Sequence, residues 1–121
     1  MILADTSVWI DHFRGTLRSR PLGESLETGE IVVHSFVLGE LALGYLGPRR
    51  ARIIEDLGRL PCVPVVSDAE VLAMVEGRRL FASGIGWVDA HLIASALSAQ
   101  ASLWTFDAPL ARIAARLRVA G

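Results

Sequence analysis

Lysine is absent from this 121-residue chain, and all 12 basic side chains are arginine. Because there are 13 acidic residues, the formal net charge is only −1. A protein this close to neutrality has no overall field that attracts nucleic acid, so any polyanion must be bound by a local group of arginines. The missing lysine also removes the usual ammonium partner for acidic side chains.

Cysteine and long hydrophobic runs are also scarce. Cys62 is the only cysteine, which excludes an intrachain disulfide and favours a reducing compartment. The longest apolar stretch, residues 36–46, is too short to cross a bilayer and contains Glu40. No secretory signal is evident, because Asp5 interrupts the first apolar run. We expect a soluble, cytoplasmic protein with no membrane association.

Hydrophobic residues make up 52% of the chain, enough for one domain spanning residues 1–121 with its own core. Short apolar runs alternate with helical patterns, which predicts an α/β fold with a parallel sheet and helices on both faces. The expected strands are residues 1–4, 30–34, 61–66, 102–105 and 118–120. The expected helices are residues 8–14, 21–27, 36–45 with Ser35 as N-cap, 48–60, 68–82 with Ser67 as N-cap, 88–100 and 108–117.

The first strand stands out because the chain begins on it and Asp5 ends it abruptly. A strand in this place is expected at the centre of the sheet, where ligands bind beyond the carboxyl ends of the strands. Asp107 ends the fourth expected strand in the same way. If the two strands are neighbours, these carboxylates converge.

Two further acids interrupt apolar helices. Glu40 is the only charge between Phe36 and Leu46, on a helix that is apolar all round and therefore expected to be buried. Asp89 lies in the first turn of the helix after the Gly84–Gly86 break. Each acid also has a structural explanation: Glu40 could bond to backbone or to an arginine, and Asp89 and Asp107 could cap helices.

Four carboxylates cannot share a small cavity without positive charge, and no lysine supplies it. A hard divalent cation, Mg²⁺ or Mn²⁺, bound by oxygen atoms and water, accounts for the set. The hydroxyl groups of Ser7 and Thr105 stand beside Asp5 and Asp107, where they could orient a carboxylate or a metal-bound water.

Other α/β phosphate chemistries lack their residues here. A receiver domain or a haloacid-dehalogenase-like phosphatase needs a strand-end lysine, and the second also needs an aspartate where Ser7 stands. No Walker glycine-lysine loop is present, and the two glycines Gly84 and Gly86 do not form a dinucleotide fingerprint. His12, His34 and His91 share no metal-ligand spacing, so we interpret them as incidental or as minor RNA contacts.

The segments around the four acids resemble those of PIN-domain ribonucleases, and among these most closely VapC toxins of prokaryotic toxin–antitoxin pairs. The resemblance lies in Asp5-Thr-Ser, in GELALG around Glu40, in GIGWVDAHLIASA around Asp89 and in Thr105-Phe-Asp107. It implies a PIN-like α/β/α sandwich with a five-stranded parallel sheet of order 3-2-1-4-5. It also implies Mg²⁺- or Mn²⁺-dependent RNA cleavage, a homodimer and inhibition by a cognate VapB-type antitoxin.

The residues that match the family's acidic positions are Asp5, Glu40, Asp89 and Asp107. We expect the three aspartates to hold the metal directly or through water, and Glu40 to act through water. Arg78 and Arg79, just before the glycine break, are the predicted RNA contacts, whereas Arg52 is expected to pair with Glu55 or Asp56. Two alternatives remain open: a catalytically idle PIN-like protein that binds RNA or a partner, and a metal phosphoesterase that acts on DNA or small phosphates.

Overall fold

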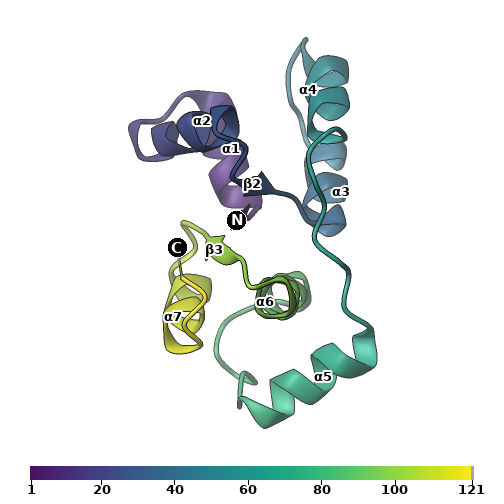
Figure 1. The fold of residues 1–121 in the computed structure, drawn as a ribbon, viewed down its shortest axis with the longest axis vertical. Coiled ribbons are helices and arrows are strands. Elements are labelled where there is room, and N and C mark those ends of the chain that lie inside the picture. Colours follow the sequence, from purple (N-terminus) through teal and green to yellow (C-terminus); the bar gives the residue numbers. More distant parts are fainter. Residues whose placement is uncertain (121) are drawn as a thin grey trace.

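The computed structural model describes residues 1–120, which form a small parallel sheet surrounded by helices (Figure 1). In chain order the elements are β1 (Ile2–Ala4), α1 (Thr6–Arg14), the 3-10 helix η1 (Leu17–Ser19), α2 (Arg20–Glu27), β2 (Ile31–Val32), α3 (Ser35–Leu43), α4 (Arg50–Leu57), α5 (Asp68–Gly77), α6 (Trp87–Ala99), β3 (Ser102–Trp104) and α7 (Ala108–Arg116).

The sheet has three parallel strands in the order β2-β1-β3. The first strand is central, as predicted, with Leu3 paired to Val32 on one side and to Leu103 on the other. Because β1 and β3 are parallel neighbours, the residues that follow them emerge at the same edge of the sheet. The α/β prediction with a parallel sheet is therefore confirmed.

The prediction of five strands is wrong for the described residues. The third and fifth expected strands are reduced to single parallel bridges, Val33 to Cys62 and Leu103 to Ala120. These bridges lie on the outer sides predicted by the order 3-2-1-4-5, but neither extends into a ladder. Pro61 and Pro64 lack the amide hydrogen that a longer ladder needs, and Arg118 leaves the extended region with φ of 61°.

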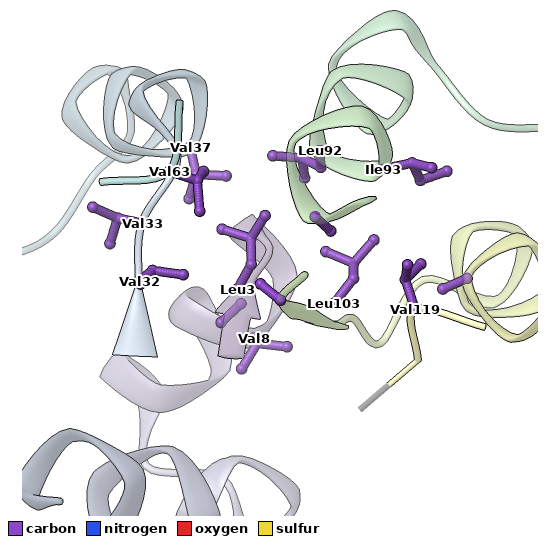
Figure 2. Close-up of a cluster of buried hydrophobic side chains, with 14 of the residues drawn as sticks. Leu3, Val8, Val32, Val33, Val37, Val63, Leu92, Ile93, Leu103 and Val119 are labelled. Atoms are coloured by element: carbon purple, nitrogen blue, oxygen red, sulfur yellow. The ribbon is translucent and has the colours of Figure 1, made fainter. Parts of the chain in front are cut away.

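The hydrophobic core fills both faces of the sheet. Figure 2 shows Leu92 and Ile93 of α6 over one face of Leu3 and Leu103, while Val8 of α1 lies on the opposite side. All five side chains are almost fully buried. β1 is thus covered by helices on both faces. For this reason its residues are all apolar, instead of alternating between apolar and polar.

Most helices begin or end a few residues from the predicted bounds. α1 begins at Thr6 rather than at residue 8, because the Asp5 side chain caps it by accepting a hydrogen bond from the Val8 amide. α3 is capped by His34, whose Nδ1 accepts from the Phe36 amide, and not by Ser35. The predicted cap of α5 is confirmed: Ser67 Oγ accepts from the Glu70 amide.

The expectation that the apolar helix around Glu40 is buried is wrong. Val37 and Leu41 of α3 are buried, but Glu40 is exposed and Leu43 is 91% exposed. α3 packs along one side only, so its all-round apolar composition leaves an uncovered hydrophobic face. Glu40 therefore needs no buried counter-charge.

Among the described helices, none is long and apolar enough to cross a membrane.

Candidate active site

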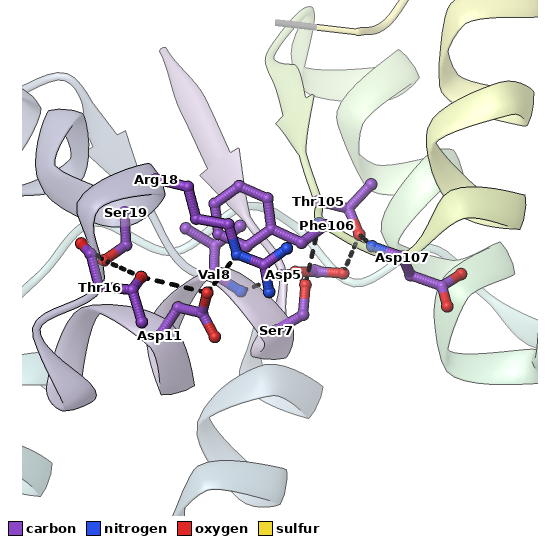
Figure 3. A network of polar contacts seen from close by, with 10 residues as sticks. All are labelled: Asp5, Ser7, Val8, Asp11, Thr16, Arg18, Ser19, Thr105, Phe106 and Asp107. Atoms are coloured by element: carbon purple, nitrogen blue, oxygen red, sulfur yellow. Dashed lines mark hydrogen bonds and ion pairs between the residues drawn. The ribbon is translucent and has the colours of Figure 1, made fainter.

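Asp5 lies at the carboxyl end of β1 and is 5% exposed. Its carboxylate is held on both oxygens: Oδ1 accepts from Ser7 Oγ at 2.5 Å, and Oδ2 accepts from the Thr105 hydroxyl (Figure 3). Both hydroxyls were predicted to orient a carboxylate in this region. The orientation of Asp5 is consequently fixed by one neighbour in its own segment and one beyond β3.

Asp107 follows β3 two residues after Thr105. Its backbone amide donates to Thr105 Oγ1 at 2.9 Å, and its carboxylate Oδ2 accepts from the Leu110 amide at 3.1 Å. Asp107 is therefore the N-cap of α7, as its structural explanation anticipated. The hydrogen bonds through Thr105 also bring Asp107 beside the carboxyl end of β1.

Asp89 stands in the first turn of α6 and accepts a hydrogen bond from the Gly86 amide at 3.0 Å. Burial raises the pKa of Asp89 above its ordinary value of 3.8, and the charges of Asp107, Asp5 and Glu40 raise it further, while the Gly86 hydrogen bond opposes them. Asp89 therefore caps its helix and also shares one electrostatic environment with the three other acids.

Glu40 reaches this environment from α3. Thr6 donates its hydroxyl hydrogen bond to Glu40 Oε1 at 3.0 Å, across 34 residues. The partner is thus a threonine of α1, rather than the backbone group or arginine considered from sequence. This contact ties the exposed carboxylate of Glu40 to the residue next to Asp5.

A cavity of about 350 Å³ opens between these elements. It is lined by Asp5, Thr6, Glu40, Gly86, Trp87, Val88, Asp89 and Leu92. Three of the four predicted acids thus face one cavity. The fourth, Asp107, is absent from its lining but contributes its charge to Asp89.

The donor set suits a hard divalent cation, although the side chains are not drawn together around one point. Within residues 1–120, no three carboxylate, imidazole or thiol side chains converge closely enough to hold one ion by themselves. All candidate ligands are oxygen atoms, and a cation would offset the like charges that raise the pKa of Asp89. Mg²⁺ keeps several of its waters when bound by carboxylates, so such a site does not require every acid to touch the ion.

The predicted RNA contacts lie away from this cavity. Arg78 and Arg79 follow α5, both are exposed, and neither lines the acidic cavity. The Arg78 carbonyl accepts a hydrogen bond from Arg116 Nη2 at 2.7 Å. Their role in RNA binding stays a prediction. The pairing of Arg52 with Asp56 is confirmed, with Nε 3.2 Å from the carboxylate.

Two of the histidines cannot be surface RNA contacts. The side chains of His34 and His91 are completely buried, and His91 Nε2 lies 3.0 Å from Asp68 Oδ1. Sequence reasoning also passed over Thr6 and Trp87, which line the cavity. The sequence offered one signal for each of them: Thr6 directly follows Asp5, and Trp87 stands two residues before Asp89.

The structure is that of an α/β domain with carboxylates at the carboxyl edge of a parallel sheet. The family model of the PIN domain matches residues 2–116. The chain is also 44% identical, over 121 residues, to Ribonuclease VapC32 of Mycobacterium tuberculosis, in strains CDC 1551 / Oshkosh and ATCC 25618 / H37Rv. The alignment covers 99% of this chain and 95% of the relative. This chain therefore belongs to the PIN-domain family, among its VapC-type ribonucleases.

Proposed function

We propose that this protein is the toxin of a type II toxin–antitoxin pair, a Mg²⁺- or Mn²⁺-dependent endoribonuclease that inhibits translation and growth by cutting RNA. The observation that carries the proposal is the cavity that Asp5, Glu40 and Asp89 line together, in which the hydroxyl groups of Ser7 and Thr105 hold the Asp5 carboxylate. In a chain without lysine, a divalent cation is the fitting counter-charge. The name of the M. tuberculosis relative supports ribonuclease activity.

The residues fall into distinct roles. Asp5, Asp89 and Asp107 would hold the cation directly or through water, and Glu40 would act through water. When bound, the cation lowers the pKa of a coordinated water and offsets negative charge on the phosphate. Ser7 and Thr105 hold Asp5 in place. Thr6 occupies Glu40 Oε1, which leaves Oε2 to accept a proton from the attacking water.

The reaction these residues would support is attack of water on phosphorus in line with the departing 3′ oxygen, in which a new O–P bond would form as the P–O3′ bond breaks. Glu40 or solvent would take the proton of the water, and O3′ would take a proton from solvent, which leaves a 5′-phosphate and a 3′-hydroxyl. We further propose that the protein works in the cytoplasm, forms a homodimer and is inhibited by a cognate VapB-type antitoxin.

The decisive experiment uses purified protein freed of any bound antitoxin and a structured RNA. We expect cleavage with Mg²⁺ or Mn²⁺ and none with EDTA. Asp5→Asn and Asp89→Asn should abolish cleavage, whereas Asp56→Asn, an exposed acid of α4, should not. Equal cleavage in EDTA would contradict metal dependence. Binding of RNA without cleavage by the parent would instead favour a catalytically idle PIN-like protein.

Expression in a bacterium tests the biological part separately. The parent should arrest growth, and Asp5→Asn or Asp89→Asn should be tolerated at equal protein level. Sequencing of RNA ends shortly after induction would identify the cleaved RNA. If either variant remains as toxic as the parent, that residue is not essential in the way proposed.

A further inference from the structure

The guanidinium group of Arg18 is held in one place at the edge of the acidic site. Arg18 lies in η1, and its side chain is 61% exposed. Its Nε donates to Asp11 Oδ2 at 2.5 Å, and its Cζ lies 4.2 Å from the centroid of the Phe106 ring (Figure 3). Two independent contacts, one ionic and one over an aromatic face, therefore fix a charge that could otherwise move freely in solvent.

Asp11 is itself well anchored. Its side chain is only 12% exposed, and its Oδ2 also accepts from Thr16 Oγ1 at 3.1 Å. The hydrogen bond from Arg18 lowers the pKa of Asp11, with burial opposing and Thr16 assisting. Asp11 stays ionised at neutral pH and so provides a permanent partner for Arg18.

The contacts of Arg18 leave most of its hydrogen-bonding capacity unused. Within residues 1–120 only Nε donates, so the terminal Nη1 and Nη2 amino groups make no hydrogen bond. A planar guanidinium with both amino groups available is suited to bidentate binding of a phosphate. Stacking on Phe106 does not consume these in-plane donors.

Phe106 connects this group to the site. Its amide donates to Ser7 Oγ at 3.0 Å, and Ser7 donates to Asp5. Figure 3 shows the guanidinium over the Phe106 ring, and Asp107 directly follows Phe106 in the chain. Arg18 is therefore linked to Asp5 through Phe106 and Ser7, and to Asp107 through Phe106. Within residues 1–120, the side chains of Arg78 and Arg79 make no hydrogen bond to this group of residues.

We propose that Arg18 binds a backbone phosphate of the RNA strand adjacent to the phosphate that is cleaved, with Asp11 and Phe106 as its positioning residues. This inference rests on the proposed function. Four carboxylates repel an RNA strand, and because every basic residue of this chain is an arginine, the side chain that binds a phosphate beside them has to be an arginine. The competing explanation is that Arg18 only secures η1 to α1.

Arg18→Met separates the two explanations, because methionine keeps an unbranched apolar stem over Phe106 and removes the charge. The matched control is Arg52→Met, which removes an exposed arginine that also pairs with an aspartate through Nε. Binding of a fluorescent single-stranded RNA is measured over a range of salt concentrations. EDTA is present, so that the RNA is not cleaved during the measurement. Thermal melts of each protein are recorded alongside.

We expect Arg18→Met to weaken RNA binding roughly tenfold and to reduce the slope of log K against log salt by about 0.7, the value for one single-strand phosphate contact. Arg18→Lys should recover most of the slope but only part of the affinity. Lysine restores the charge, but it lacks the two coplanar amino groups with which a guanidinium binds a phosphate. Arg52→Met should change neither quantity. Unchanged affinity and slope in Arg18→Met, with a lowered melting temperature, would show that Arg18 only secures η1.

Cleavage kinetics with Mg²⁺ distinguish a failure of this inference from a failure of the proposed function. In Arg18→Met we expect KM to rise about tenfold while kcat stays within about twofold, since the lost contact is to a phosphate that does not react and holds the substrate and the transition state equally. If the parent binds RNA but does not cut it, the proposed function fails and the comparison of binding slopes still tests Arg18. If the parent cuts RNA and KM is unchanged in Arg18→Met, the inference about Arg18 alone is wrong.

Discussion

The Thr105 hydroxyl donates a hydrogen bond to Oδ2 of Asp5, so that two residues 100 positions apart jointly place one carboxylate. Thr105 Oγ1 also accepts from the Asp107 amide. One hydroxyl thus connects the acids that end β1 and follow β3. Its position depends directly on the parallel pairing of these strands.

Thr105→Val should weaken the metal site without disturbing the fold. Valine has nearly the same shape but cannot donate to Asp5, and the loss of a group that orients a ligand typically costs about 10- to 100-fold in metal affinity or activity. Mg²⁺ titration by calorimetry, together with the rate of RNA cleavage, measures both effects. Thr28→Val, which removes a surface hydroxyl bonded to Glu30, is the control and should alter neither. Parental Mg²⁺ affinity in Thr105→Val would mean that this hydroxyl does not orient a ligand.

Asp89→Asn should reveal the repulsion among the acids. Since the folded state raises the pKa of Asp89, ionisation of Asp89 destabilises the metal-free protein as pH rises through that pKa. Asparagine removes the charge and still caps α6, so the metal-free variant should melt no lower than the parent at pH 7. Thermal melts in EDTA at fixed ionic strength measure this.

The same melts with Mg²⁺ test whether Asp89 binds metal. In the parent, Mg²⁺ at about ten times its dissociation constant should stabilise the fold by roughly 1.4 kcal/mol. Asp89→Asn should lose most of this gain. A Mg²⁺ shift that survives in the variant would leave Asp89 with the capping role alone.

His34 should make the fold sensitive to mild acid. Burial, and secondarily the nearby His91, lower the pKa of His34 from 6.5 to about 4. Between these values the unfolded chain binds more protons than the folded one, so the free energy of unfolding decreases as pH falls from about 6.5 towards 4. A shift of this size corresponds to a loss on the order of 3 kcal/mol. Protonation of Nδ1 also removes the acceptor that caps α3.

Urea unfolding between pH 4 and 7 measures this loss in the parent and in His34→Asn, since asparagine caps a helix but does not titrate. The variant should show a flatter pH dependence in this range. The control is His12→Gln, because burial also lowers the pKa of His12 and its removal corrects for that smaller contribution. An identical pH dependence in His34→Asn and the parent would mean that another group governs acid unfolding.

The sequence predicted the places of Asp5 and Asp107, after two neighbouring parallel strands, better than the edges of the sheet. Asp5 and Asp107 could be placed because each ends an apolar run abruptly, and parallel strands deliver such residues to the same edge. The strand around Cys62 could not be judged from its valines, because Pro61 and Pro64 remove ladder donors and one bridge is all that forms. The central strand was recognisable, whereas the extent of the outer ones depends on pairing over a few residues.

Glu40 and Arg18 show what residue patterns leave undetermined. The apolar composition of α3 predicted burial, but only one side of that helix packs, and Glu40 is exposed. Arg18 carried no signal at all, because its proposed role rests on contacts with Asp11 and Phe106 that only the fold brings about. Composition indicates that a helix can be buried, while the number of elements available to cover it is a tertiary property.

The antitoxin should act at the acidic cavity. The cavity has a volume of about 350 Å³ and is lined in part by Asp5, Glu40 and Asp89. The chain has no lysine to neutralise these carboxylates. An arginine of the partner could therefore enter the cavity, form charge-assisted hydrogen bonds and exclude the cation. Asp89→Asn should then weaken the complex, and bound antitoxin should lower the apparent Mg²⁺ affinity of the parent.

Inhibition could instead rest on hydrophobic contact with the uncovered end of α3, where Leu43 and Tyr45 are 91% and 93% exposed. In that case Leu43→Ser combined with Tyr45→Ser should weaken the complex, while Asp89→Asn should not. Calorimetric binding of the antitoxin to these variants, with a Mg²⁺ titration of the complex, distinguishes the two mechanisms. A complex that keeps the parental Mg²⁺ affinity and tolerates Asp89→Asn would exclude insertion of a charge into the cavity, because a cation-binding cavity cannot hold a guanidinium and leave its metal affinity unchanged.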